Sequence, residues 1–269
     1  MTQYPFTQAE MNFVPAGIRV PEARYHGASG EAKRNYEAER REVQVADGRL
    51  LQNDYGLDTS GFELVRAPTQ LGPVENPDHP DISKVYYPEV EAIFRRATGA
   101  TEVLIFDHTI RITGSDTVRR PVQNVHNDYT HESAPVRLAQ LVGDEAARDW
   151  LKGRVAQVNL WRPLRGPVRA LPLALVDARS LGPHDLRDTA LIYDDRVGHI
   201  YHLSYNPDQK WVYFPGMTTD EALLIKGYDS ARDGRARFTP HSAFELRGTP
   251  ADAPPRHSIE VRAFLRFGS

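Results

Sequence analysis

Cysteine is absent from the 269 residues of the chain. Its absence excludes disulfides, iron–sulfur clusters, cysteine-ligated zinc and thiol nucleophiles. A metal site in this chain must therefore use histidine, carboxylate or carbonyl ligands. A chain without disulfides also fits a reducing compartment, and we predict a cytoplasmic location.

Long apolar runs and blocks of like charge are missing as well. No stretch reaches the length of a membrane span, and the first residues lack the basic and apolar segments of a secretory signal. The 33 basic and 36 acidic residues are interspersed and leave a net charge of −3. We therefore predict neither a nucleic-acid partner nor a membrane partner, and the oligomeric state stays open.

Length and patterning predict one mainly β domain, of the α+β type, that spans residues 1–269. The order of elements favours a jelly roll, in which two sheets form a double-stranded β-helix like that of the cupins. Residues 1–100 are expected to form an N-terminal arm and helical support, with an irregular segment over 1–30. Helices are expected over 31–43, 88–98 and 136–152. Strands are expected over 43–49, over 101–106 with 108–112 continuing or following it, and over 155–163, 173–177, 190–193, 199–205, 210–214, 222–228, 236–238 and 258–267.

The chemistry is predicted to centre on His126 and Asp128, which are two residues apart. On a strand, alternate side chains share a face, so the imidazole and the carboxylate would converge on one point. The pair would supply two ligands of the two-histidine, one-carboxylate arrangement that holds non-haem Fe(II) and leaves open positions. His241 and His202 are the candidates for the third ligand, and each lies in or beside a strand-like stretch.

A third motif opens the last predicted strand, where Arg256 and Ser258 would share a face. A guanidinium and a hydroxyl together suit a carboxylate, because the planar fork donates two parallel hydrogen bonds and the hydroxyl adds a third. Arg262 has the same alternation and is the alternative carboxylate-binding residue. The simpler interpretation of either arginine is an ordinary surface cation.

Together these motifs resemble the Fe(II)/2-oxoglutarate-dependent oxygenases, and within them the CmcJ/AsaB-like hydroxylase/desaturase group. The resemblance extends from about residue 40 to the end of the chain. It is carried by residues 126–130, 159–164, 172–180, 213–215, 228–230, 238–244 and 254–262.

The resemblance implies particular roles for the residues of these motifs. His126, Asp128 and His241 become the iron ligands, which favours His241 over His202. Arg256 and Ser258 become the residues that bind the far carboxylate of 2-oxoglutarate.

Three further residues are candidates for the substrate side of the site. Tyr129 directly follows the ligand motif and is expected to line the substrate pocket. Trp161 is a candidate for the same pocket or for the core, where large aromatic side chains on buried strands are common. Arg162 is expected to pair with a carboxylate, either in the pocket or at Asp177.

The implied activity is that of a dioxygenase that uses Fe(II), O2 and 2-oxoglutarate. Such an enzyme would convert 2-oxoglutarate to succinate while it hydroxylates or desaturates a small-molecule substrate of secondary metabolism. Two alternatives remain. One is an oxidase with the same ligands but no 2-oxoglutarate, as in isopenicillin-synthase-like enzymes. The other is a non-catalytic metal-binding jelly roll.

Overall fold

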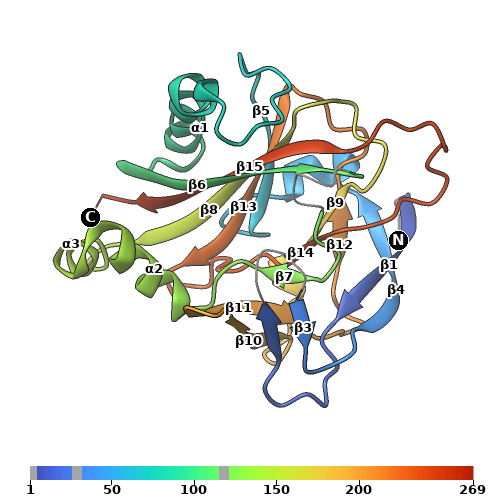
Figure 1. Ribbon diagram of the computed structural model, residues 1–269, viewed down its shortest axis with the longest axis horizontal. Coiled ribbons are helices and arrows are strands. Elements are labelled where there is room, and N and C mark those ends of the chain that lie inside the picture. Colours follow the sequence, from blue (N-terminus) through green and yellow to red (C-terminus); the bar gives the residue numbers. More distant parts are fainter. Residues whose placement is uncertain (1–4, 26–31, 115–120, 269) are drawn as a thin grey trace.

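Two β-sheets packed face to face form the body of the molecule in the computed structural model, which describes residues 5–25, 32–114 and 121–268 (Figure 1). One sheet has ten strands in the order β1-β4-β12-β9-β14-β7-β11-β10-β2-β3. The other has five strands in the order β5-β13-β8-β15-β6. The strands of the larger sheet are β1 (Phe6–Phe13), β2 (Glu22–Tyr25), β3 (Ala32–Arg34), β4 (Glu39–Asp47), β7 (His126–Asn127), β9 (Leu173–Val176), β10 (Leu186–Ile192), β11 (Val197–Leu203), β12 (Trp211–Tyr213) and β14 (His241–Ala243). Those of the smaller sheet are β5 (Phe62–Arg66), β6 (Glu102–Ile112), β8 (Val155–Pro163), β13 (Glu221–Asp229) and β15 (His257–Arg266).

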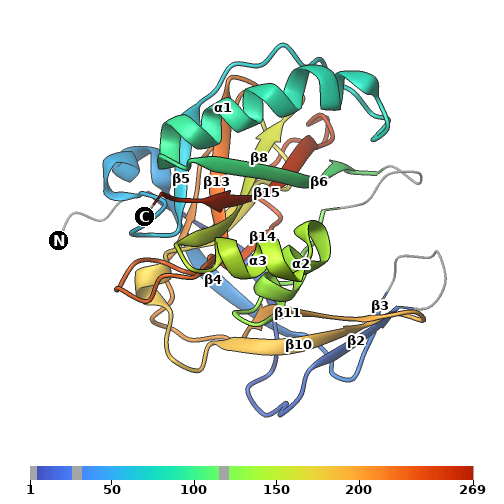
Figure 2. The same ribbon diagram turned by 90° about the vertical axis from the view of Figure 1, so that its left-hand side faces the viewer.

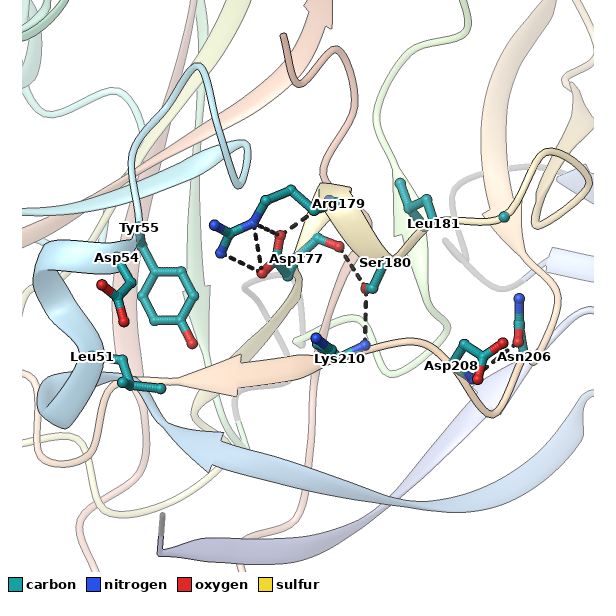
Figure 3. A pocket seen from close by; sticks show the side chains of 11 residues that line it. Leu51, Asp54, Tyr55, Asp177, Arg179, Ser180, Leu181, Asn206, Asp208 and Lys210 are labelled. Atoms are coloured by element: carbon teal, nitrogen blue, oxygen red, sulfur yellow. Dashed lines mark hydrogen bonds and ion pairs between the residues drawn. The ribbon is translucent and has the colours of Figure 1, made fainter. Parts of the chain in front are cut away.

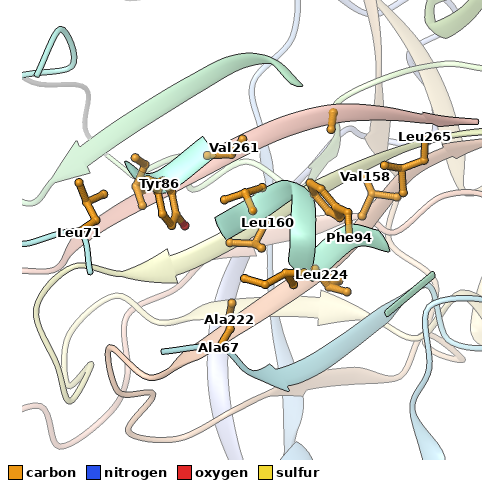
Figure 4. Packing of buried hydrophobic residues seen from close by; sticks show 14 of the residues in the cluster. Ala67, Leu71, Tyr86, Phe94, Val158, Leu160, Ala222, Leu224, Val261 and Leu265 are labelled. Carbon is orange, nitrogen blue, oxygen red and sulfur yellow. The ribbon is translucent and has the colours of Figure 1, made fainter. Parts of the chain in front are cut away.

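The smaller sheet is covered on both faces, which explains why β8 is buried along its whole length. Leu160 faces a core on the side of helix α1 (Tyr87–Thr98), whereas Trp161 faces the space between the two sheets. Successive side chains of a strand point to opposite faces, so a strand buried on both sides has a continuous apolar run rather than an alternation. Figure 4 shows the α1-side core, where Phe94 packs against Val158 and Leu224.

Helix α1 confirms the sequence prediction at 88–98. Pro88 lies in its first turn, where the missing N–H leaves no hydrogen bond unmade, and Gly99 ends it with φ 73°. The predicted helix at 136–152 is interrupted. Gly143, at φ 86° and ψ 157°, separates α2 (Ser133–Val142) from α3 (Asp144–Trp150).

Two predictions for the N-terminal region are wrong. Residues 31–43 contain β3 and the start of β4 instead of a helix, and residues 1–30 contain β1 and β2 instead of an irregular segment. Strand β4 pairs with β1 and β12, and Val43 and Val45 alternate into a core behind the larger sheet. Tertiary pairing therefore overrides the helix propensity of the Glu- and Arg-rich sequence.

Residues 236–238, predicted as a strand, have an irregular conformation. They lead directly into β14, which carries His241. Within the described part of the chain, no helix is both long enough and apolar enough to span a bilayer.

Candidate metal centre

The candidate ligands come together at β7, a strand of two residues between β11 and β14. His126 pairs in register with His241 on β14 and with His202 on β11. Asp128 follows the end of β7. One ligand atom from each of His126, Asp128 and His241 lies within 4.8 Å of the other two, and the two imidazole centroids are 4.7 Å apart.

Asn127, between the first two candidate ligands, fixes the local backbone, although nothing in the sequence singled out its side chain. Its side chain is fully buried, and its amide donates to the carbonyls of Tyr129, at 2.7 Å, and of Gly227 on β13, at 2.8 Å. Its carbonyl oxygen accepts from the backbone N–H of Thr239 at 2.9 Å. One amide therefore connects the segment that carries His126 and Asp128 to the one that leads into His241.

Both histidines present the same ring nitrogen to the centre. Nδ1 of His126 lies 2.8 Å from the carbonyl of Asn124, and Nδ1 of His241 lies 3.0 Å from that of Thr239. A carbonyl only accepts, so each Nδ1 carries the proton and each Nε2 keeps a free lone pair. Burial, together with nearby His241, lowers the pKa of His126 to about 4, which favours the neutral, ligating form.

Asp128 is held so that one carboxylate oxygen remains available. Its Oδ2 accepts from Arg262 Nε at 3.0 Å and from Asn159 Nδ2 at 2.8 Å, while its Oδ1 lies 3.6 Å from His126 Nε2. Burial alone would raise the pKa of this carboxyl, but Arg262 and the two histidines hold it well below its usual range. The carboxylate is therefore charged, and the arrangement favours a single bond to a cation through Oδ1.

Arg262 is fully engaged in supporting Asp128. Its remaining nitrogens donate to Asp107 at 3.1 Å, Thr109 at 3.1 Å and Glu260 at 2.7 Å. The alternation that made Arg262 an alternative carboxylate-binding residue does bring it to the site. There, however, its hydrogen bonds are directed to protein carboxylates and to the hydroxyl of Thr109.

Arg256 differs, because it is a buried cation that makes no salt bridge with any residue that the structure describes, although the carboxylate of Glu260 lines the same cavity. Its side chain is 4% exposed, one guanidinium nitrogen donates to the carbonyl of Leu171 at 2.7 Å, and Nε has no partner. The guanidinium lies 5.5 Å from the ring centroid of Trp161. Burial, with a smaller contribution from Arg111, lowers the pKa of Arg256 to about 9. Ser258 Oγ is likewise buried without a partner, so both side chains retain hydrogen-bonding capacity for a carboxylate.

A small cavity joins Arg256 to the candidate ligands. Its lining includes His126, His241, Trp161 and Arg256, and its volume is about 20 Å³. This is room for about one water molecule, which needs roughly 10–15 Å³ of such space. Neighbouring side chains must therefore move before an organic acid can enter.

A larger cavity of about 720 Å³ reaches the centre from the other side, and Asp128 and Tyr129 belong to its lining. The candidate ligands thus lie between a small cavity with a buried cation and a larger one open to solvent. Trp161 lines the small cavity rather than the large one.

One of the predicted site residues, Arg162, lies away from the candidate metal centre. Arg162, next to Trp161 on β8, points to the opposite face, where its guanidinium lies 5.1 Å from the ring centroid of Tyr86. The predicted pairing of Arg162 with Asp177 is wrong, because Arg179 binds both carboxylate oxygens of Asp177 (Figure 3). That ion pair lines a surface pocket of about 750 Å³ that contains none of the candidate metal ligands.

His202 is close to His126 in the sheet but makes different contacts. Its Nδ1 lies 3.1 Å from Thr189 Oγ1 and 3.2 Å from the hydroxyl of Tyr36, and burial lowers its pKa to about 3. His202 does not belong to the three-residue group formed by His126, Asp128 and His241. The geometry favours His241 as the third ligand.

Comparisons with known proteins agree with this chemistry. Residues 11–266 match a family model described as an oxidoreductase/YMDC permease-like domain. The chain is 34% identical to the hydroxylase/desaturase efuI of Hormonema carpetanum, over 89% of this chain and 88% of the relative. It is 32% identical to the Fe(II)/2-oxoglutarate-dependent dioxygenase nvfI of Aspergillus novofumigatus, over 97% and 96% of the two chains.

A solved structure shares the fold over nearly the whole length. The iron and alpha-ketoglutarate-dependent endoperoxidase NvfI superposes with a TM-score of 0.88 at 30% identity, and the match covers 98% of this chain and 99% of that one. The expected jelly-roll fold is confirmed. The chain belongs to the family of Fe(II)/2-oxoglutarate-dependent dioxygenases that includes these hydroxylases and desaturases.

Proposed function

We propose that His126, Asp128 and His241 hold the Fe(II) of this dioxygenase, and that the enzyme hydroxylates or desaturates a small organic molecule of secondary metabolism. One observation carries the assignment of the ligands. One nitrogen from each imidazole and one carboxylate oxygen converge within 4.8 Å, while Nδ1 of each histidine and Oδ2 of Asp128 form hydrogen bonds with the protein. This donor set suits Fe(II) and leaves coordination positions open.

When bound, Fe(II) and 2-oxoglutarate supply the oxidation, in which O2 and 2-oxoglutarate are consumed and a C–H bond of the substrate is oxidised. The chain supplies position and charge. Asp128 would neutralise part of the charge of a bound metal, and Arg262 and Asn159 hold its Oδ2 in hydrogen bonds to the protein. A carboxylate held in this way would offer a metal one oxygen instead of two.

Arg256 and Ser258 are proposed to bind the far carboxylate of 2-oxoglutarate. The support is that Arg256 lines the small cavity beside the candidate ligands with its Nε buried and without a partner, and that Ser258 Oγ, two residues further along the chain, is also buried without a partner. Trp161 packs against the guanidinium and would keep it in place. Tyr129 is proposed to contact the substrate from the larger cavity.

We also propose that residues 1–269 act as one domain. Strands from the first hundred residues belong to both sheets, since β1 and β4 extend the larger sheet and β5 forms an edge of the smaller one. The cytoplasmic location stays a prediction, which fractionation of cells that produce the protein would test.

Calorimetric titration with Fe(II) under anaerobic conditions tests the ligand assignment. His241→Ala is expected to weaken Fe(II) binding by at least 100-fold, because one of three protein ligands is lost. His202→Ala, at the neighbouring position in the sheet, is the matched control and should bind Fe(II) like the parent. Loss of binding in His202→Ala with retention in His241→Ala would overturn the assignment.

A further inference from the structure

The larger cavity is a groove between helix α2 and the hairpin formed by β10 and β11. We call it the helix–hairpin groove, and Figure 2 shows its two walls, with α2 facing the hairpin. Its helical wall is formed by Ser133, Val136, Arg137 and Gln140. These residues have the spacing of one face of a helix, whereas Ala134 and Leu138 on the other face are buried in the core.

Apolar side chains face the groove from both walls although solvent reaches them. Val136 on α2 is 57% exposed and Val197 at the start of β11 is 59% exposed. Leu191 on β10 also lines the groove. These side chains would be desolvated by an apolar body that entered from solvent and extended toward Asp128.

Most charged groups around the groove already have a protein partner. Asp188 lies 2.7 Å from His199, and Arg196 lies 3.3 Å from Asp195. Glu132, at the entrance, lies 3.5 Å from His131.

Arg137 is the exception among the described residues that line the groove. Its guanidinium makes no ion pair there, donates to the neutral amide of Gln140 at 3.3 Å, and lies 5.5 Å from the ring centroid of Phe106. The ring of Phe106 stacks on Phe264, which in turn contacts Tyr129. Aromatic packing thus places this cation on the groove wall, near the residue that follows Asp128.

We propose that Arg137 determines substrate specificity by binding an acidic group, such as a carboxylate, of the substrate. The apolar body of that substrate fills the helix–hairpin groove. This inference rests on the proposed function. A partly buried guanidinium without a protein anion is complementary to such a group, and its planar fork can donate two parallel hydrogen bonds. The acid is held at the helical wall, so that the apolar body extends past Tyr129 to the metal. The substrate class is therefore a small apolar acid rather than its neutral ester or amide.

The test uses a matched pair of probes, 1-naphthoate and its neutral methyl ester. Their affinities are measured by ligand-observed NMR under anaerobic conditions, with Fe(II) and saturating 2-oxoglutarate present so that Arg256 is occupied. In the parent, the acid is expected to bind at least 10-fold more tightly than the ester. Arg137→Gln should abolish this preference, while Arg137→Lys should retain part of it.

Arg196→Gln is the control, because it removes a more exposed cation from the opposite wall whose charge is already paired with Asp195. It should leave the preference for the acid unchanged. Equal binding of acid and ester by the parent, or an equal loss of the preference in Arg137→Gln and Arg196→Gln, would overturn the proposal.

Failure of this proposal is distinguishable from failure of the proposed function. The binding assay involves no turnover, and the parent is assayed in parallel for formation of succinate from 2-oxoglutarate. A parent that forms no succinate but loses acid binding on Arg137→Gln would refute the proposed function and leave the assignment of the groove intact.

Discussion

Replacement of Arg256 by lysine tests the proposed cosubstrate site with little change in charge. Lysine keeps the cation but loses the planar fork and the contact with Trp161. In the structure, Nε of Arg256 is buried without a partner, and one terminal nitrogen is fixed by the carbonyl of Leu171. The guanidinium is therefore oriented before an anion arrives, which an ammonium group on a flexible chain cannot reproduce.

The expected magnitude follows from the burial of the site. Loss of one partner of a buried, hydrogen-bonded charge pair costs about 2–5 kcal/mol. At about 1.4 kcal/mol per tenfold change, the affinity for 2-oxoglutarate should fall roughly thirty- to several-thousand-fold in Arg256→Lys. Fe(II) affinity should be unchanged, because Arg256 contacts none of the three ligands.

Anaerobic calorimetry, first with Fe(II) and then with 2-oxoglutarate, measures both affinities. Arg262→Lys is the informative comparison, since Arg262 supports Asp128 and its loss should weaken Fe(II) binding by about 10- to 100-fold. The reasoning would be refuted if Arg256→Lys bound 2-oxoglutarate normally while Arg262→Lys, at saturating Fe(II), did not bind it. That result would identify Arg262 as the carboxylate-binding residue.

Two further predictions concern the support of the site and the response of the fold to pH. Asn127→Ala removes three hydrogen bonds and leaves buried backbone groups unpaired. The free energy of unfolding, measured in urea, should therefore fall by roughly 2–4 kcal/mol. A fall of less than about 0.5 kcal/mol would contradict the role given to this amide. Burial lowers the pKa of His257, so the unfolded chain binds the additional proton and stability should decrease as pH falls below about 6.5. The test measures unfolding midpoints between pH 7.5 and 5, values chosen to bracket roughly that pKa. The midpoint should change less steeply with pH in His257→Gln than in the parent. Identical slopes for the two proteins would show that His257 contributes nothing.

The parts of the fold that could be predicted are those whose signal is local. Strand β8 has the predicted bounds, Val155–Pro163, because a strand buried on both faces has an uninterrupted apolar run. Helix α1 was predictable from Pro88 at its start and Gly99 after its end. Strand β4 was predictable only from Val43 onward, because its first half, over 39–42, is held by pairing with β1, which the local sequence does not encode.

The candidate site shows the same division between local and distant information. The spacing of His126 and Asp128 was visible in the sequence, but the expected cause was a common strand face, whereas β7 ends at Asn127. Asp128 is positioned by Asn159 and Arg262, which are 31 and 134 residues away along the chain. Contacts of that separation follow from the stacking of the two sheets, so sequence reasoning selected the candidate ligands and Arg262 but did not predict that Arg262 and Asn159 orient Asp128.

The most direct test of the account is the Fe(II)-dependent conversion of 2-oxoglutarate to succinate by the purified protein. Succinate is measured in the presence of O2 for the parent, His241→Ala and His202→Ala. The account predicts formation of succinate that requires added Fe(II), disappears in His241→Ala and persists in His202→Ala. The account would be contradicted if the parent formed no succinate with Fe(II), O2 and 2-oxoglutarate over a panel of small apolar acids and their esters. It would also be contradicted if His241→Ala still formed succinate.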